Sequence, residues 1–135
     1  MPLITWGPRL ETGISIIDAQ HKRLVEIINE FNDALEAGRS NEIMGAIFDE
    51  LVAYTETHFS VEEKLMAAHG YEEIEEHRRE HRVFTDQIKM DRYNFNAGAW
   101  NYEQKMKDYL RGWLVNHIAA SDRGYVPTLK EAGVE

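Results

Sequence analysis

The chain has 135 residues, which is enough for one domain with a buried core and too few for two. Hydrophobic residues make up 43% and charged residues 29%, a balance typical of globular proteins and far from that of disordered or membrane proteins. The formal net charge of -9, with scattered basic residues, argues against binding to nucleic acid or to anionic membranes.

Two absences narrow the function further. The sequence has no apolar segment long enough to span a bilayer and no signal-peptide pattern at its start, so we expect a cytoplasmic protein without membrane insertion. It has no cysteine, which excludes disulfides, iron-sulfur clusters and thiolate zinc sites. Any metal must therefore be held by nitrogen and oxygen donors.

The first two elements differ in their patterns. Residues 1–17 contain two prolines and two glycines among apolar side chains, which predicts an extended N-terminal arm without regular helix. From Asp18 onward, apolar residues recur at spacings of three and four together with His21, which predicts a helix. Gly38 is expected to end it.

Three further helical runs follow. The second contains His58 and Glu62, is capped by Ser40 or Asn41 and ends at Gly70. The third shows the 3, 4, 3, 4 spacing of a bundle seam, at Ile74, His77, His81, Phe84 and Ile88. The fourth starts near Asn101 and leads to His117.

The connections are short, so consecutive helices should be antiparallel neighbours. We predict a single all-α domain over residues 1–135, an antiparallel up-down-up-down four-helix bundle. Its parts are the extended N-terminal arm (1–17), the bundle (18–122) and a C-terminal tail (123–135).

Counting from the turns indicates that the histidines lie at one level. His58 and Glu62 lie 12 and 8 residues before Gly70, while His77 and His81 lie 7 and 11 residues after it. In antiparallel helices, residues equally distant from the connecting turn face each other.

The first and last predicted helices each bring one more histidine to this level. His21 lies 18 residues before Arg39 and His58 lies 19 after it, and His117 matches within the length of a flexible loop. His69 falls beyond this level, and we expect it at the surface near a helix end. A single histidine is more often an ordinary core residue, but five that converge with a carboxylate in a dry core indicate a metal.

The ligand motifs resemble those of the hemerythrin family, particularly its single-domain bacterial members, the bacteriohemerythrins. The likeness covers nearly the whole chain and rests on Asp18-Ala-Gln-His21, His58-x3-Glu62, His77-x3-His81 and His117-x4-Asp122. It implies two non-haem iron ions joined by an oxo or hydroxo bridge. It further implies that His77, His81 and His117 bind one iron, that His21 and His58 bind the other, and that Glu62 and Asp122 bridge them.

This ligand count fills six positions on one iron and five on the other. The resemblance therefore implies reversible dioxygen binding for storage, delivery or transfer to oxygen-using enzymes. We expect no catalytic residues, a monomer, and an oxygen-consuming protein as recipient.

Two alternatives remain. One is a di-iron oxidase or peroxidase that consumes oxygen or nitric oxide, and the other is a sensor of these gases. Spacing alone does not select iron over zinc, manganese or cobalt.

Two local features qualify the site. Candidate walls of an oxygen pocket lie one turn or one residue from a ligand, namely Leu24, Phe59, Leu114 and Ile118, although ordinary core packing explains them equally well. Asp122 is five residues after His117, about 140° around an ideal helix, so we expect the helix to loosen or end there.

Overall fold

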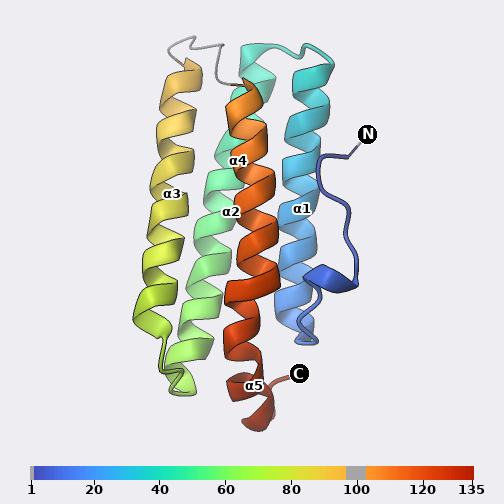
Figure 1. Ribbon diagram of the computed structural model, residues 1–135. Coiled ribbons are helices and arrows are strands. Elements are labelled where there is room, and N and C mark those ends of the chain that lie inside the picture. The colour runs from blue at the N-terminus through green and yellow to red at the C-terminus, as the bar shows by residue number, and fades with distance from the viewer. Residues whose placement is uncertain (1, 97–102) are drawn as a thin grey trace.

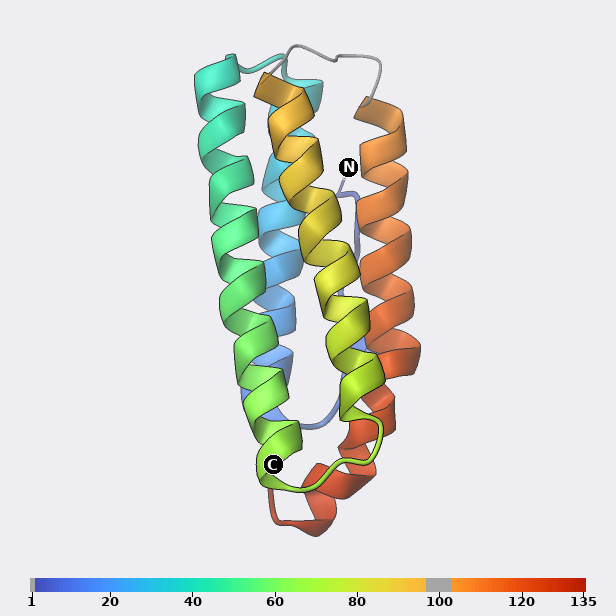
Figure 2. The same cartoon turned by 90° about the vertical axis from the view of Figure 1, so that its left-hand side faces the viewer.

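The structure is a computed structural model that describes residues 2–96 and 103–135 (Figure 1). Four long helices run side by side: α1 (Ser15–Glu36), α2 (Asn41–Ala68), α3 (Ile74–Asn96) and α4 (Glu103–Asn116). Successive helices alternate in direction in both views (Figures 1 and 2), and no strand occurs in the described part of the chain. The predicted all-α, up-down-up-down four-helix bundle is confirmed. The expected start of the fourth helix at Asn101 lies outside the described residues.

The first two helices end at the glycines that the sequence indicated. Gly38 and Gly70 both have positive φ, 65° and 69°. The residue after each glycine forms a backbone hydrogen bond with the last helical turn. Arg39 N donates to Ala34 O and Tyr71 N donates to Met66 O, both at 3.0 Å. Glycine adopts this left-handed conformation without steric cost, so both helices stop where the short connections must begin.

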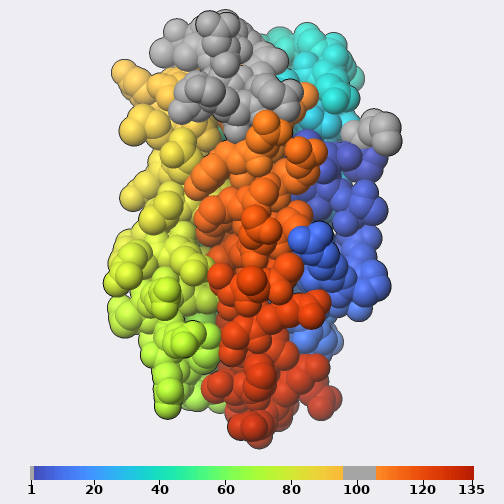
Figure 3. Space-filling model, viewed as in Figure 1, coloured from blue at the N-terminus to red at the C-terminus, as the bar shows by residue number. Residues whose placement is uncertain are grey.

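The N-terminal arm is more ordered than the sequence indicated. It contains a short 3₁₀-helix, η1 (Pro8–Leu10), and α1 begins at Ser15 rather than Asp18. The amide of the earlier first residue finds its partner outside the helix, because Ser15 N donates to the main-chain oxygen of Glu135 at 3.1 Å. Asp18 anchors the arm by accepting hydrogen bonds from the Thr12 and Gly13 amides at 2.8 and 3.1 Å. The arm then lies along the bundle surface beside α4 (Figure 3).

The C-terminal segment 123–135, which we expected as a tail after the bundle, is largely helical. After α4 the chain continues through a π-helical segment, η3 (His117–Asp122), into a further helix, α5 (Arg123–Glu131). This helix continues past Pro127 because it buries Tyr125 and Leu129 against the end of the bundle. Segment α5 therefore closes the lower end of the molecule in Figure 1.

Two apolar clusters divide the core along the bundle axis. The larger fills most of the bundle, and the smaller joins Ile14, Ile17, Met66, Tyr125 and Leu129 near α5. On each of the four long helical segments, buried histidines or carboxylates lie where the larger cluster meets the smaller one. A polar layer thus separates the two apolar clusters. None of the described helices is long and apolar enough to cross a membrane.

Candidate metal centre

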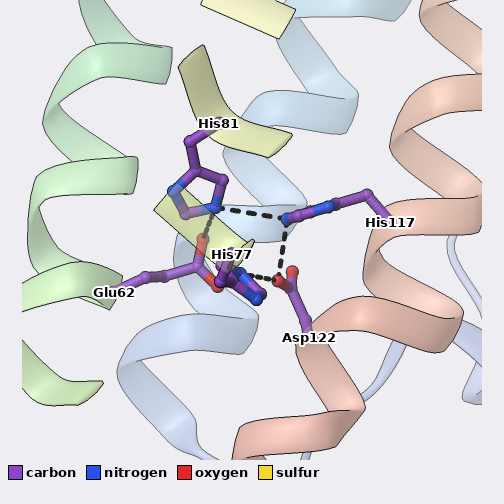
Figure 4. Close-up of side chains that lie close together, drawn as sticks. All are labelled: Glu62, His77, His81, His117 and Asp122. Carbon is purple, nitrogen blue, oxygen red and sulfur yellow. Dashed lines mark hydrogen bonds and ion pairs between the residues drawn. The ribbon is translucent and has the colours of Figure 1, made fainter. Parts of the chain in front are cut away.

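The structure brings all seven predicted ligand residues into this polar layer. His21 comes from α1, His58 and Glu62 from α2, His77 and His81 from α3, and His117 and Asp122 from η3, and all are buried. Five of them point toward one another in Figure 4. One ligand atom from each of these five lies within 4.8 Å of the others, and His21, His58 and Glu62 form a second such group. His69 caps the end of α2 and belongs to neither group.

Asp122 connects three histidines. Its Oδ1 lies 2.9 Å from Nε2 of both His77 and His117, and its Oδ2 lies 3.1 Å from Nε2 of His21. The two oxygens of one carboxylate therefore face histidines from different sides of the layer.

Glu62, like Asp122, lies close to three histidines. Its Oε1 lies 2.9 Å from His58 Nε2 and 3.5 Å from His81 Nε2, while its Oε2 lies 3.8 Å from His21 Nε2. Oε2 also accepts a hydrogen bond of 2.5 Å from the Tyr125 hydroxyl. Both carboxylates thus lie between the two histidine groups.

The π-helical segment accounts for the placement of Asp122. An α-helix would direct a residue five positions after His117 toward a different face. In η3 each turn holds more residues, which brings Asp122 back toward the face that carries His117. The expected loosening of the helix at Asp122 is therefore realised as a widened turn.

In three of the histidines, the ring nitrogen that faces away from the polar layer, Nδ1, contacts a polar side chain. His58 Nδ1 lies 2.7 Å from Gln20 Oε1, His81 Nδ1 lies 3.0 Å from Glu63 Oε2, and His117 Nδ1 lies 3.0 Å from Glu80 Oε2. Because these oxygens only accept hydrogen bonds, each Nδ1 carries a proton and each ring turns its Nε2 toward the polar layer. This arrangement is typical of histidines that bind a metal.

The inward nitrogen and oxygen atoms lie close together. Nε2 of His81 and Nε2 of His117 are 3.2 Å apart, and both oxygens of Asp122 and Glu62 Oε1 lie 2.9 to 3.5 Å from imidazole Nε2 atoms. Facing lone pairs in a buried layer are unfavourable unless a proton or a metal ion lies between them. Nitrogen and oxygen donors of this kind fit iron, so the residues present suit a metal pair.

The carboxylates and histidines of the polar layer shift one another's pKa values. Burial raises the pKa of Asp122, but the facing His117, His21 and His77 outweigh it and hold that pKa well below its ordinary value. Burial lowers the pKa of His117, but Asp122 and the nearby glutamates raise it overall. The cluster thus favours carboxylates together with positive charge, which a bound cation also supplies.

The Tyr125 hydroxyl keeps its proton in this environment. Burial, followed by the charges of Glu62 and Asp122, raises the pKa of Tyr125 well above its ordinary value. The hydroxyl therefore donates to the Glu62 carboxylate.

Aromatic and aliphatic side chains cover the upper side of the layer. Phe59 stacks on the His81 ring with centroids 3.7 Å apart, and Trp113 stacks on the His117 ring at 4.3 Å. The pocket candidates Leu24, Phe59, Leu114 and Ile118 are all buried. Their burial fits both a pocket wall and ordinary core packing.

Four residues around the centre were not predicted from sequence: Gln20, Glu63, Glu80 and Tyr125. Gln20 lies inside the Asp18-Ala-Gln-His21 motif and Glu63 follows Glu62, so their position beside predicted ligands could have indicated a role at the centre. Tyr125 gave none, because its contact depends on the direction of α5.

Fold and site together define a helical-bundle metalloprotein with a non-haem centre of imidazole and carboxylate donors. A family model described as "Hemerythrin HHE cation binding domain" matches residues 12–129. Bacteriohemerythrin of Pseudomonas aeruginosa is 38% identical over 132 residues, which cover 98% of this chain and 85% of that protein. Bacteriohemerythrin of Methylococcus capsulatus is 33% identical over 130 residues, with coverage of 96% and 98%. A crystal structure of wild-type hemerythrin matches with a TM-score of 0.86 and 31% identity, over 94% of this chain and 98% of that one.

The chain belongs to the hemerythrin family. Members of this family bind oxygen at a di-iron site, and the cofactor is a pair of non-haem iron ions. The donor set gathered between the two apolar clusters fits that cofactor.

Proposed function

We propose that this chain binds dioxygen reversibly at its di-iron centre and serves in oxygen storage, delivery or transfer. It acts, in this proposal, as a cytoplasmic monomer that passes dioxygen to an oxygen-consuming protein and not as an enzyme. The observation that carries the proposal is the position of the two carboxylates, since Asp122 and Glu62 each face histidines of both groups.

These contacts support the ligand assignment that the family resemblance implies. His77, His81 and His117 would hold one ion, His21 and His58 would hold the other, and Glu62 and Asp122 would bridge the two. Asp122 supports this assignment by facing His77 and His117 with one oxygen and His21 with the other. Glu62 supports it by placing Oε1 between His58 and His81.

The unequal sets leave one ion with fewer protein ligands than the other. When bound, the iron pair supplies an open coordination position and the electrons that dioxygen takes up. The chain's own contribution is to hold five imidazole nitrogens inward and to keep that position free of a side chain. Gln20, Glu63 and Glu80 perform the first task by fixing three Nδ1 protons.

The apolar side of the centre supports binding without further reaction. Leu24, Phe59, Leu114 and Ile118 would exclude water and protons from the open position. Five neutral imidazoles and two carboxylates also donate less negative charge than the carboxylate-rich centres of ferritin-like di-iron proteins. Both features favour an oxygen carrier over an oxidase.

The test is an optical titration of the reduced, iron-loaded protein, with iron measured in parallel. We expect a charge-transfer band that appears with oxygen and disappears when oxygen is removed, over repeated cycles. A band that bleaches irreversibly after one exposure would contradict reversible binding. Steady consumption of oxygen or nitric oxide with added reductant would favour the enzyme instead.

A further inference from the structure

Tyr125 lies beneath the candidate metal centre and belongs to none of the ligand motifs. It is 1% exposed and lies in α5, three residues after Asp122. Its ring packs edge-on against Tyr71 at 6.4 Å and lies 5.6 Å from the His77 ring. Its hydroxyl reaches out of this apolar cluster and donates to Glu62 Oε2 at 2.5 Å.

Both groups need this hydrogen bond. A phenol hydroxyl buried among apolar side chains is costly without an acceptor, and a buried carboxylate oxygen is costlier without a donor. The hydroxyl of Tyr125 is the donor that the described residues offer to Glu62 Oε2 from outside the histidine groups. The bond is short and charge-assisted, which makes it a strong geometric constraint.

Because a carboxylate is planar, fixing one oxygen also fixes the other. With Oε2 held by Tyr125, Oε1 lies 2.9 Å from His58 Nε2 and 3.5 Å from His81 Nε2. These two histidines belong to different groups. The orientation of the carboxylate therefore decides whether Glu62 faces both groups or only one.

We propose that Tyr125 is a positioning residue of the metal centre, which holds the Glu62 carboxylate so that Oε1 stays directed between His58 and His81. This inference rests on the proposed function only in taking Glu62 as a metal ligand. It also gives α5 a role in the centre besides closing the end of the bundle.

The alternative is that Tyr125 only fills space, and neighbouring residues provide controls that separate the two roles. Tyr125→Phe removes the hydroxyl and keeps the ring. Tyr71→Phe removes a neighbouring hydroxyl that donates to the exposed Glu73 at 3.3 Å, away from the ligands. Leu129→Ala removes buried apolar contacts of α5 and leaves both hydroxyls in place.

The experiment measures Co²⁺ and Fe²⁺ binding to the full chain without oxygen, by competition with a chromogenic chelator, and records the visible Co²⁺ spectrum. We expect Tyr125→Phe to weaken binding of at least one ion about 10- to 100-fold and to change the Co²⁺ bands. Tyr71→Phe should stay close to the wild type in both. Leu129→Ala should lower the thermal midpoint without changing the Co²⁺ bands.

Two outcomes would overturn the inference while leaving the proposed function intact. In the first, Tyr125→Phe binds two ions with the affinity and spectrum of the wild type. In the second, Leu129→Ala reproduces both the affinity loss and the spectral change of Tyr125→Phe, which would make Tyr125 a packing residue. Failure of the wild type itself to bind two ions would instead remove the proposed function.

A measurement on Zn²⁺-loaded protein needs no Tyr125 variant and covers the case in which Tyr125→Phe does not fold. A hydroxyl in a short bond to a buried carboxylate exchanges slowly and gives a downfield proton resonance in NMR. We expect such a tyrosine resonance in both the wild type and Tyr71→Phe. Its absence from the loaded wild-type protein would overturn the inference.

Discussion

Gln20 provides the sharpest test of how the histidines are held. Its Oε1 lies 2.7 Å from His58 Nδ1 and fixes the tautomer in which Nε2 faces the metal layer. In Gln20→Leu the side chain keeps similar bulk but loses the acceptor, so the ring can rotate or place its proton on Nε2. We therefore expect weaker metal binding at the half of the centre that His58 serves.

The magnitude follows from the single contact that is lost. Replacing the outer partner of a metal-binding histidine costs 10- to 100-fold in metal affinity, which corresponds to about 1.4 to 2.8 kcal/mol. Gln20 is only half-buried, so water can partly replace it. We expect a loss near the lower end, about tenfold, and close to wild-type affinity in Gln20→Glu, which keeps an acceptor oxygen.

The assay is chelator competition with Fe²⁺ and Co²⁺ on the full chain without oxygen. The matched control is Asn29→Leu, since the Asn29 amide is also half-buried on α1 but bonds the backbone of Ile4 in the arm, with both contacts at 2.9 Å. This control should lower stability and leave metal affinity unchanged. Equal affinity in Gln20→Leu and the wild type would refute the argument that Gln20 fixes the His58 tautomer.

Three further predictions concern ligands, pocket and core. His77→Ala should reduce iron well below two per chain, while His69→Ala should keep the wild-type content; equal losses would refute the argument from helix levels. Phe59→Leu should cost about 1 to 3 kcal/mol of stability through lost aromatic contacts and shorten the life of the oxygenated form, whereas Phe31→Leu should affect stability alone. If both variants keep wild-type lifetimes, Phe59 is ordinary core. Burial raises the pKa of Asp91, so the ionised carboxylate destabilises the folded protein as pH rises above about 4, the ordinary pKa of the unfolded state. The variant Asp91→Asn should therefore raise the melting temperature of the metal-free protein at pH about 7 but not at pH about 3. Equal gains at both pH values would contradict this.

The parts of the molecule that repeat regularly could be predicted from sequence. Helical spacing and distance from the turns suffice to bring His21, His58, His77 and His81 to one level, because straight antiparallel helices preserve register over many residues. The glycine turns at Gly38 and Gly70 were predictable for the same local reason.

The parts that depend on long-range contacts could not be predicted. The first amide of α1, at Ser15, donates to the main-chain oxygen of Glu135, and no local pattern near Ser15 contains that information. Segment α5 could not be predicted for the same reason, because proline disfavours a helix interior and what carries the helix past Pro127 is the burial of Tyr125 and Leu129 against distant parts of the chain.

The π-helical segment completes the centre where regular periodicity fails. Its widened turn brings Asp122 to His21, His77 and His117, and α5, which continues from it, places Tyr125 against Glu62. Such segments are rare and persist where surrounding contacts stabilise them, often at functional sites. Here the contacts of one carboxylate with three histidines and the burial of α5 provide that stabilisation. In the proposed assignment, the same local irregularity supplies the ligand Asp122 and also places Tyr125 against Glu62, so the departure of the last helix from regular geometry serves both carboxylates.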